Sequence, residues 1–219
     1  MILRKRPSGG TAGVVYVEFL LAFFPVFILF MGVAQLVLLY AARLVVHHAA
    51  VRSTRAAVVI AHDDPQYYDG LAVGDLGGRT ATAEDVLHAL SRGGVPGAGA
   101  GGGVRPPPSR RSAIETSAAL VVLPLAGRGD VSLGGAVGSG GLRDAVDRTM
   151  ARLTVTFPGI GEEPVPHDGE IAVRVAYRYP CNVPIARRLI CGTGASRDLE
   201  SQLIMPAQGA QFAYEGWSP

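Results

Sequence analysis

The stretch Phe19–Ala42, FLLAFFPVFILFMGVAQLVLLYAA, decides how the rest of this chain is organised. It contains 24 residues and no formal charge. As a helix rising about 1.5 Å per residue it would be about 36 Å long. A hydrocarbon core of about 30 Å needs roughly 20 apolar residues, so the stretch is long enough to cross a bilayer with some tilt. We therefore expect a transmembrane helix near the N-terminus.

Charges on either side of this stretch indicate its orientation. Arg4, Lys5 and Arg6 precede it and Arg43 follows it, and basic clusters next to a span are retained in the cytoplasm. A cleaved secretory signal peptide has a similar basic start. Its apolar region is normally shorter, and here Arg43 directly follows the small residues that would form a cleavage site. We therefore favour an anchor with an exported C-terminal part.

Glu18 lies at the entrance to the apolar stretch. A carboxylate costs about 2.5–3.5 kcal/mol near the centre of a bilayer and less toward the interface. Cleavage between Gly13 and Val14 would create an α-amino group on Val14, and the carboxylate of Glu18 could then pair with the ammonium of a neighbouring subunit. Alternatively, Glu18 lies in the headgroup layer and marks the cytoplasmic end of the span. Charge placement alone does not separate these two interpretations.

The residues around Glu18 resemble the processing site of type IV prepilins, in which a Gly, four further residues and a Glu follow a short basic leader and precede an apolar helix. In this sequence the motif is Gly13-Val14-Val15-Tyr16-Val17-Glu18-Phe19. The continuation more narrowly resembles the TadE-like family of minor pseudopilins. Members of that family show a Val-Glu-Phe, a later Pro and a Gly beyond it, which correspond here to Val17-Glu18-Phe19, Pro25 and Gly32.

The resemblance implies cleavage after Gly13 by a prepilin peptidase and a role in assembling a tight-adherence (Tad) pilus. It also implies the partners, which are other pilins and pseudopilins, the prepilin peptidase, the pilus assembly platform in the bacterial inner membrane, and membrane lipid. Phe19 stands where the major pilins usually have Tyr, and 219 residues are far more than those small pilins contain. We therefore expect an accessory subunit.

The fold class that we expect is α+β, with a long helix ahead of a small domain built on an antiparallel sheet. Residues 1–13 would form a cytoplasmic leader, residues 14–62 a transmembrane and extended helix, and residues 63–219 an extracytoplasmic domain. Pro25 should kink the helix because it removes one backbone hydrogen bond. Asp63-Asp64-Pro65 should end it, since the residue before Pro disfavours the helical region.

Small residues recur along the helix at Ala42, Ala49 and Ala56. This spacing would let another helix approach closely, although an Ala-rich composition also produces it by chance. Patterns in the exported domain predict short elements. They are a helix over Ala83–Leu90 with Thr82 as its N-cap, a flexible Gly- and Pro-rich loop over residues 91–111, a buried strand over Ser117–Leu123, a helix over Leu142–Met150, a hairpin over residues 152–157 and 171–179, and a last strand near Leu199–Met205.

Cys181 and Cys191 enclose nine residues. In an oxidising compartment outside the cytoplasm such a pair favours a local disulfide. The disulfide would stabilise the folded state by roughly 2–3 kcal/mol, because it reduces the chain entropy of the unfolded state. Two free thiols are the alternative interpretation of the same spacing.

Charge and motifs exclude several function classes. Without residues 1–13 the chain has 17 basic against 18 acidic residues, which leaves no basic footprint for nucleic acid. Adjacent carboxylates such as Asp63-Asp64 have no accompanying His or Ser motif, and the histidines lack metal-ligand spacing. We therefore expect no enzyme activity, no cofactor and no metal. The alternative to a pseudopilin is a single-pass membrane protein whose exported binding domain is unrelated to pili.

Overall fold

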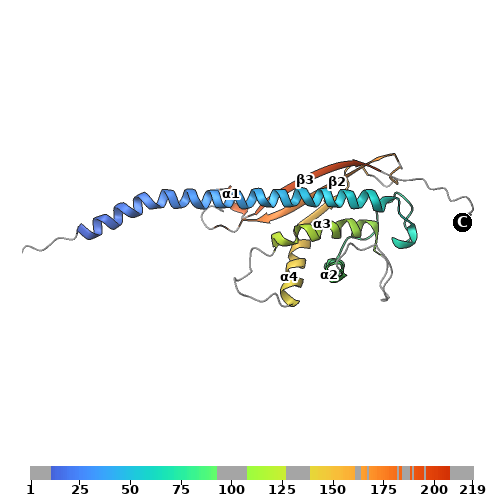
Figure 1. Cartoon of the computed structure of the whole chain (residues 1–219), viewed down its shortest axis with the longest axis horizontal. Helices are drawn as coiled ribbons and strands as arrows, with labels where there is room; N and C mark the ends of the chain where they lie inside the picture. The colour runs from blue at the N-terminus through green and yellow to red at the C-terminus, as the bar shows by residue number, and fades with distance from the viewer. Residues whose placement is uncertain are drawn as a thin grey trace, which may run out of the picture.

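The computed structural model describes residues 11–92, 108–126, 139–160, 164–166, 168–181, 183, 188, 190–194 and 196–207. These residues form one long helix, against which a sheet and a shorter helix pack, and the protein is α+β as predicted (Figure 1). The elements are α1 (Thr11–Ala61), a 3-10 turn (Pro65–Tyr67), α2 (Ala83–Arg92), α3 (Arg110–Ala126), α4 (Ser139–Met150), β1 (Leu153–Thr156), β2 (Glu170–Pro180), a second 3-10 turn (Gly192–Gly194) and β3 (Ser196–Pro206).

The sheet is antiparallel throughout, with the strand order β1-β2-β3. This confirms the predicted hairpin and last strand, and β3 begins three residues earlier than expected. The odd-numbered residues of β2 from Ile171 to Tyr179 are buried, whereas Arg174 and Arg178 on the opposite face are exposed. The covered face packs on α1, where the Nδ1 atom of His47 lies 3.0 Å from the hydroxyl oxygen of Ser201 in β3.

Helix α1 covers the predicted segment from Val14 to Ala61 and begins at Thr11, so the last residues of the expected leader are also helical. Pro25 lies inside α1, and the N-terminal, dark-blue part of the helix bends away from the axis of the rest (Figure 1). The helix ends before Asp63-Asp64-Pro65 as predicted. The carboxylate of Asp64 accepts a hydrogen bond from the N–H of Gln66 at 3.0 Å and opens the 3-10 turn.

The predicted stripe of small residues is covered within the chain itself. Ala42, Ala49, Ala50 and Ala57 are fully buried and belong to one core cluster with residues of α3, β2 and β3. Because alanine side chains are short, the backbone of α3 can run close beside that of α1. Ala56, the remaining residue of the stripe, is partly buried and packs against the same cluster.

The predicted strand over Ser117–Leu123 is wrong, because these residues belong to helix α3. Helix α3 lies between α1 on one side and α2 and α4 on the other, and most of its side chains are buried. When an element is covered all round, its apolar residues lose the spacing that separates a helix from a strand.

The helices that flank the predicted loop extend into it. Ser91 and Arg92 end α2, and Arg110 and Arg111 begin α3, while residues 93–107 lie outside the described part of the chain. The helix predicted over Leu142–Met150 begins earlier, at Ser139.

The predicted N-cap of α2 is confirmed. The N–H of Asp85 donates to the hydroxyl of Thr82 at 3.4 Å, and the carboxylate of Asp85 accepts in return from the N–H of Thr82 at 2.8 Å. This reciprocal pair satisfies backbone donors that the first turn of a helix leaves free.

A buried arginine fixes the loop that follows α1. The guanidinium of Arg110 is fully buried and its carbon lies 5.4 Å from the centre of the Tyr68 ring. Its Nε donates to the carbonyl of Ile60 at 3.0 Å. Its amino groups donate to the carbonyls of Asp63, Leu71, Ala72 and Asp75. Burial lowers the pKa of Arg110, and nearby carboxylates act in the opposite direction.

Candidate functional site

The N-terminal part of α1 projects beyond the domain (Figure 1). From Tyr16 to Ala34 no side chain is buried, and Phe19, Leu21 and Phe24 are each more than half exposed. By length and composition the described helix from Tyr16 to Ala61 can cross a membrane. So large a contiguous apolar surface is rare on a soluble monomer and is typical of contact with lipid or another protein.

Polar side chains mark the two ends of this projecting stretch. Glu18 is exposed near its start, and the first buried side chain after Tyr16, Gln35, lies about 26 Å further along the helix axis. Tyr16 and Tyr40 are both exposed and are separated by about 36 Å along the helix. Tyrosines favour the two interfaces of a bilayer, so this spacing fits a hydrocarbon core of about 30 Å between them.

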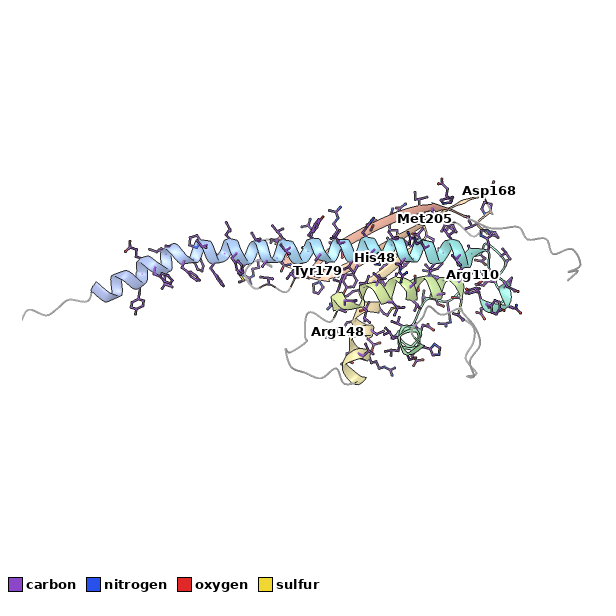
Figure 2. The ribbon with its side chains drawn as sticks, viewed as in Figure 1. His48, Arg110, Arg148, Asp168, Tyr179 and Met205 are labelled. Carbon is purple, nitrogen blue, oxygen red and sulfur yellow. A yellow bond between two sulfur atoms is a disulfide. The ribbon has the colours of Figure 1, made fainter. Side chains whose placement is uncertain are left out.

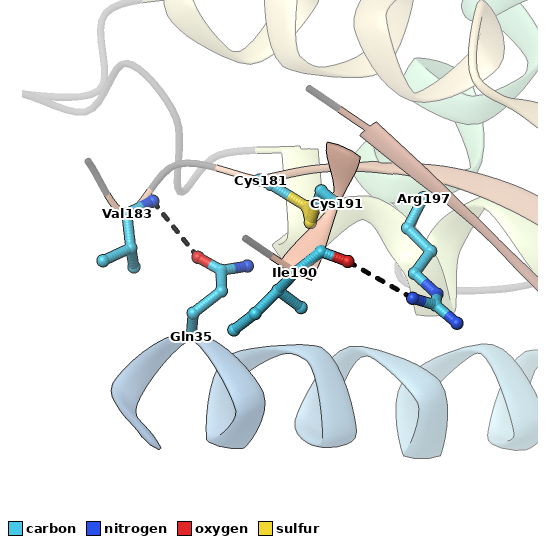
Figure 3. Close-up of a disulfide and its surroundings, with 6 residues drawn as sticks. All are labelled: Gln35, Cys181, Val183, Ile190, Cys191 and Arg197. Atoms are coloured by element: carbon cyan, nitrogen blue, oxygen red, sulfur yellow. Dashed lines mark hydrogen bonds between the residues drawn. A yellow bond between two sulfur atoms is a disulfide. The ribbon is translucent and has the colours of Figure 1, made fainter. Parts of the chain in front are cut away.

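The domain begins to cover α1 at Gln35, which is fully buried. Its side-chain oxygen accepts a hydrogen bond from the N–H of Val183 at 3.1 Å (Figure 3). Within the described part of the chain, the amide nitrogen of Gln35 has no hydrogen-bond partner. From here on α1 has two different sides, since Ala42 is buried against the domain while Leu36 and Tyr40 remain exposed. The apolar run Phe19–Ala42 is therefore projecting in its first two thirds and half-covered in the remainder.

A disulfide joins Cys181 to Cys191, as expected, and lies near Gln35, where α1 leaves the domain (Figure 3). The two Cα atoms are 6.5 Å apart, and Cys181 is buried. One amino group of Arg197, in β3, donates to the carbonyl of Ile190 at 3.3 Å. The disulfide and these hydrogen bonds hold the end of β2 and the start of β3 against α1.

The remaining predicted site residues lie in the projecting helix. Gly13 and Val14 are in the first turn of α1, and cleavage between them stays a prediction. Glu18 and Pro25 are exposed, and the pairing of Glu18 with a neighbouring subunit also stays a prediction. Sequence reasoning missed Gln35, although it is the only side-chain amide in the apolar run and that was the available signal.

Among the described residues, no group of three or more His, Cys, Asp or Glu side chains could hold a metal ion. The fold and the projecting helix define an α+β protein with one N-terminal helix that is long and apolar enough to span a membrane. Comparisons with protein-family models, curated proteins and solved structures found no match.

Proposed function

We propose that this chain is a minor pseudopilin that acts in the assembly of a Tad-type pilus and is anchored in the bacterial inner membrane by α1. The observation that carries the proposal is the projecting apolar part of α1, in which Glu18 is the single formal charge between Val14 and Ala42. An anchor accounts for the exposed apolar surface, and an assembly partner accounts for the acid within it.

The proposed mechanism is electrostatic pairing inside an apolar layer. Cleavage after Gly13 by a prepilin peptidase leaves an ammonium group on Val14. The carboxylate of Glu18 pairs with such an ammonium on another pilin or pseudopilin, and each charge compensates the desolvation of the other. The exposed residues Leu36, Val37 and Tyr40 extend the apolar surface that a neighbouring helix could cover. The domain remains on the extracytoplasmic side, where it primes or caps filament growth on the assembly platform.

The mature N-terminus tests this proposal against its alternatives. Mass spectrometry of the membrane-extracted protein should find a chain that starts at Val14. An intact start at Met1 or Ile2 would contradict processing and favour a single-pass protein with an unrelated binding domain. A start beyond Ala42 would instead identify a secreted protein.

The Glu18→Ala variant tests the pairing itself. Removing the carboxylate makes the helix more apolar, so insertion should be retained while piliation, measured by electron microscopy and by pilin in the sheared fraction, is impaired. Tyr16→Ala is the matched control, because it removes an exposed side chain two residues away without changing the charge. Wild-type piliation in the Glu18→Ala strain would refute the pairing role.

A further inference from the structure

Charged side chains are sorted along the length of the domain. Four exposed arginines lie at the end of the domain from which α1 projects, and we call this end the basic end. These residues are Arg43, Arg178, Arg188 and Arg197. At the opposite end the exposed carboxylates are Asp64, Asp69, Asp168 and Glu170. Figure 2 shows Tyr179, the neighbour of Arg178, toward the projecting part of α1 and Asp168 at the far end.

Nearby acids neutralise only part of this positive charge. Asp198 pairs with Arg178 at 3.3 Å, and Glu200 pairs with Arg174 further along the sheet at 3.0 Å. Helix α4 is balanced, because it carries two arginines and two aspartates. Among the described residues, Arg43, Arg188 and Arg197 therefore leave a net positive charge at the basic end.

The depth of the basic end follows from the packing of β3 on α1. Ser201 lies beside His47. Arg197 is four residues earlier in the strand, so at about 3.3 Å per residue it lies about 13 Å nearer the projecting part, level with Leu38. The side chain of Arg43 leans toward the N-terminus of the helix. If the hydrocarbon ends near Gln35, these guanidinium groups fall in the headgroup layer, which is about 5–8 Å thick.

The segment that carries Arg188 and Arg197 is restrained by the structure around it. Arg197 is tied to the carbonyl of Ile190 at 3.3 Å, and Arg188 belongs to the sequence segment that the disulfide closes. The same segment is fixed to α1 through the hydrogen bond between Val183 and Gln35. This segment is thus held at a set height along α1.

We propose that the basic end binds the anionic phospholipid headgroups of the outer leaflet, so that the domain stands on the membrane with its acidic end facing away. This inference rests on the proposed membrane anchoring by α1. A guanidinium matches a phosphate with two parallel hydrogen bonds. Repulsion between the acidic end and the same lipids disfavours a domain that lies on its side. The contact sets the height of Glu18 before a partner subunit arrives.

The test is arginine labelling of the full chain in vesicles of phosphatidylcholine alone or with phosphatidylglycerol, read by mass spectrometry after phenylglyoxal treatment. Labelling of Arg43, Arg188 and Arg197 should be about fivefold slower when phosphatidylglycerol is present, as expected for about 1 kcal/mol per surface arginine. Arg52 and Arg55 are exposed on the same helix and lie about 25 Å and about 30 Å beyond the hydrocarbon. They should label equally in both vesicles, because charges are screened within about 10 Å.

Salt and extraction separate the possible failures. In 1 M NaCl the protection should disappear, since the Debye length is then about 3 Å. Equal labelling in the two vesicles would overturn the lipid contact, and so would protection that salt leaves unchanged, which would indicate cover by protein. Loss of the chain from the vesicles in alkaline carbonate would instead refute the anchoring by α1.

A paired variant provides a second readout. Arg188→Gln combined with Arg197→Gln should weaken the phosphatidylglycerol-dependent protection of Arg43, whereas Arg52→Gln combined with Arg55→Gln should leave it intact. Thermal unfolding of both variants in detergent checks that the domain is folded. Unchanged protection of Arg43 in the folded first variant would overturn the proposal.

Discussion

Removal of the Arg110 guanidinium should destabilise the domain more than any exposed charge change. In Arg110→Met the apolar volume is largely kept, but the carbonyls of Ile60, Asp63 and Leu71 lose the hydrogen bond from Arg110, as do those of Ala72 and Asp75. The carbonyls of Ile60 and Ala72 each keep one backbone N–H donor. Hydrogen bonds to a charged group are worth about 1.5–3 kcal/mol each, and they are not additive. Since part of the loop can rehydrate, we expect a loss of about 3–5 kcal/mol.

Urea unfolding of the detergent-solubilised full chain measures this loss. With a slope of about 2 kcal/mol per molar urea, a loss of about 4 kcal/mol moves the midpoint down by about 2 M. Arg143→Met is the matched control, because Arg143 pairs with Glu84 only at 3.8 Å and both side chains are mostly exposed. The control should change stability by less than about 0.5 kcal/mol. A loss below about 1 kcal/mol in Arg110→Met would refute the assignment of Arg110 as the group that holds the loop.

Three further predictions concern the cap of α2, the disulfide and one glycine. Burial raises the pKa of Asp85, but hydrogen bonds from Arg79 and Thr82 lower it to about 2. Because this pKa lies below the value of about 3.9 for an unfolded aspartate, the ionised carboxylate stabilises the fold, and Asp85→Asn should destabilise the protein above pH 4. The difference in urea midpoint between the wild type and the variant should vanish as the pH falls to about 2. An Asp85→Asn deficit that is the same at pH 2 and pH 7 would contradict this. Reducing the disulfide should lower the free energy of unfolding by about 2–3 kcal/mol. It should also speed hydrogen exchange at the N–H of Val183, which donates to Gln35. Unchanged exchange would show that the disulfide does not hold the segment around Val183 against Gln35. Gly74→Ala should lower the melting temperature more than Gly70→Ala. Both glycines have positive φ, but a Cβ at Gly74 would lie 2.5 Å from the carbonyl oxygen of Val165, whereas a Cβ at Gly70 would meet open space. Equal thermal shifts in the two variants would refute the clash.

The elements that could be predicted are those whose pattern is local. The long helix follows from an uninterrupted apolar run, and the hairpin follows from alternation along β1 and β2, where one face is covered and the other is exposed. The ends of these elements follow from single residues, such as Pro65 after α1 and Thr82 before α2. Each of these signals acts within a few residues, so the sequence carries it directly.

Helix α3 could not be recognised because its surroundings erase the pattern. Its residues from Ala113 to Ala119 are buried on every side, between α1 and the other two helices. A helix can be recognised in a sequence by the periodic contrast between its apolar and polar faces, and these residues show no such contrast. Its assignment depends on how many layers cover it, which is a property of the assembled domain.

The sequence by itself determined a charge-free apolar helix with one acid at its entrance, a half-covered hairpin and a pair of cysteines close enough to bond. Tertiary structure alone decided where the domain meets that helix, because Gln35 and Val183 are 148 residues apart. It also decided that Arg110 would be buried among carbonyls 35 to 50 residues earlier in the chain. Periodicity and polarity act between neighbours along the chain, whereas a buried polar group is satisfied by whichever backbone the topology brings beside it.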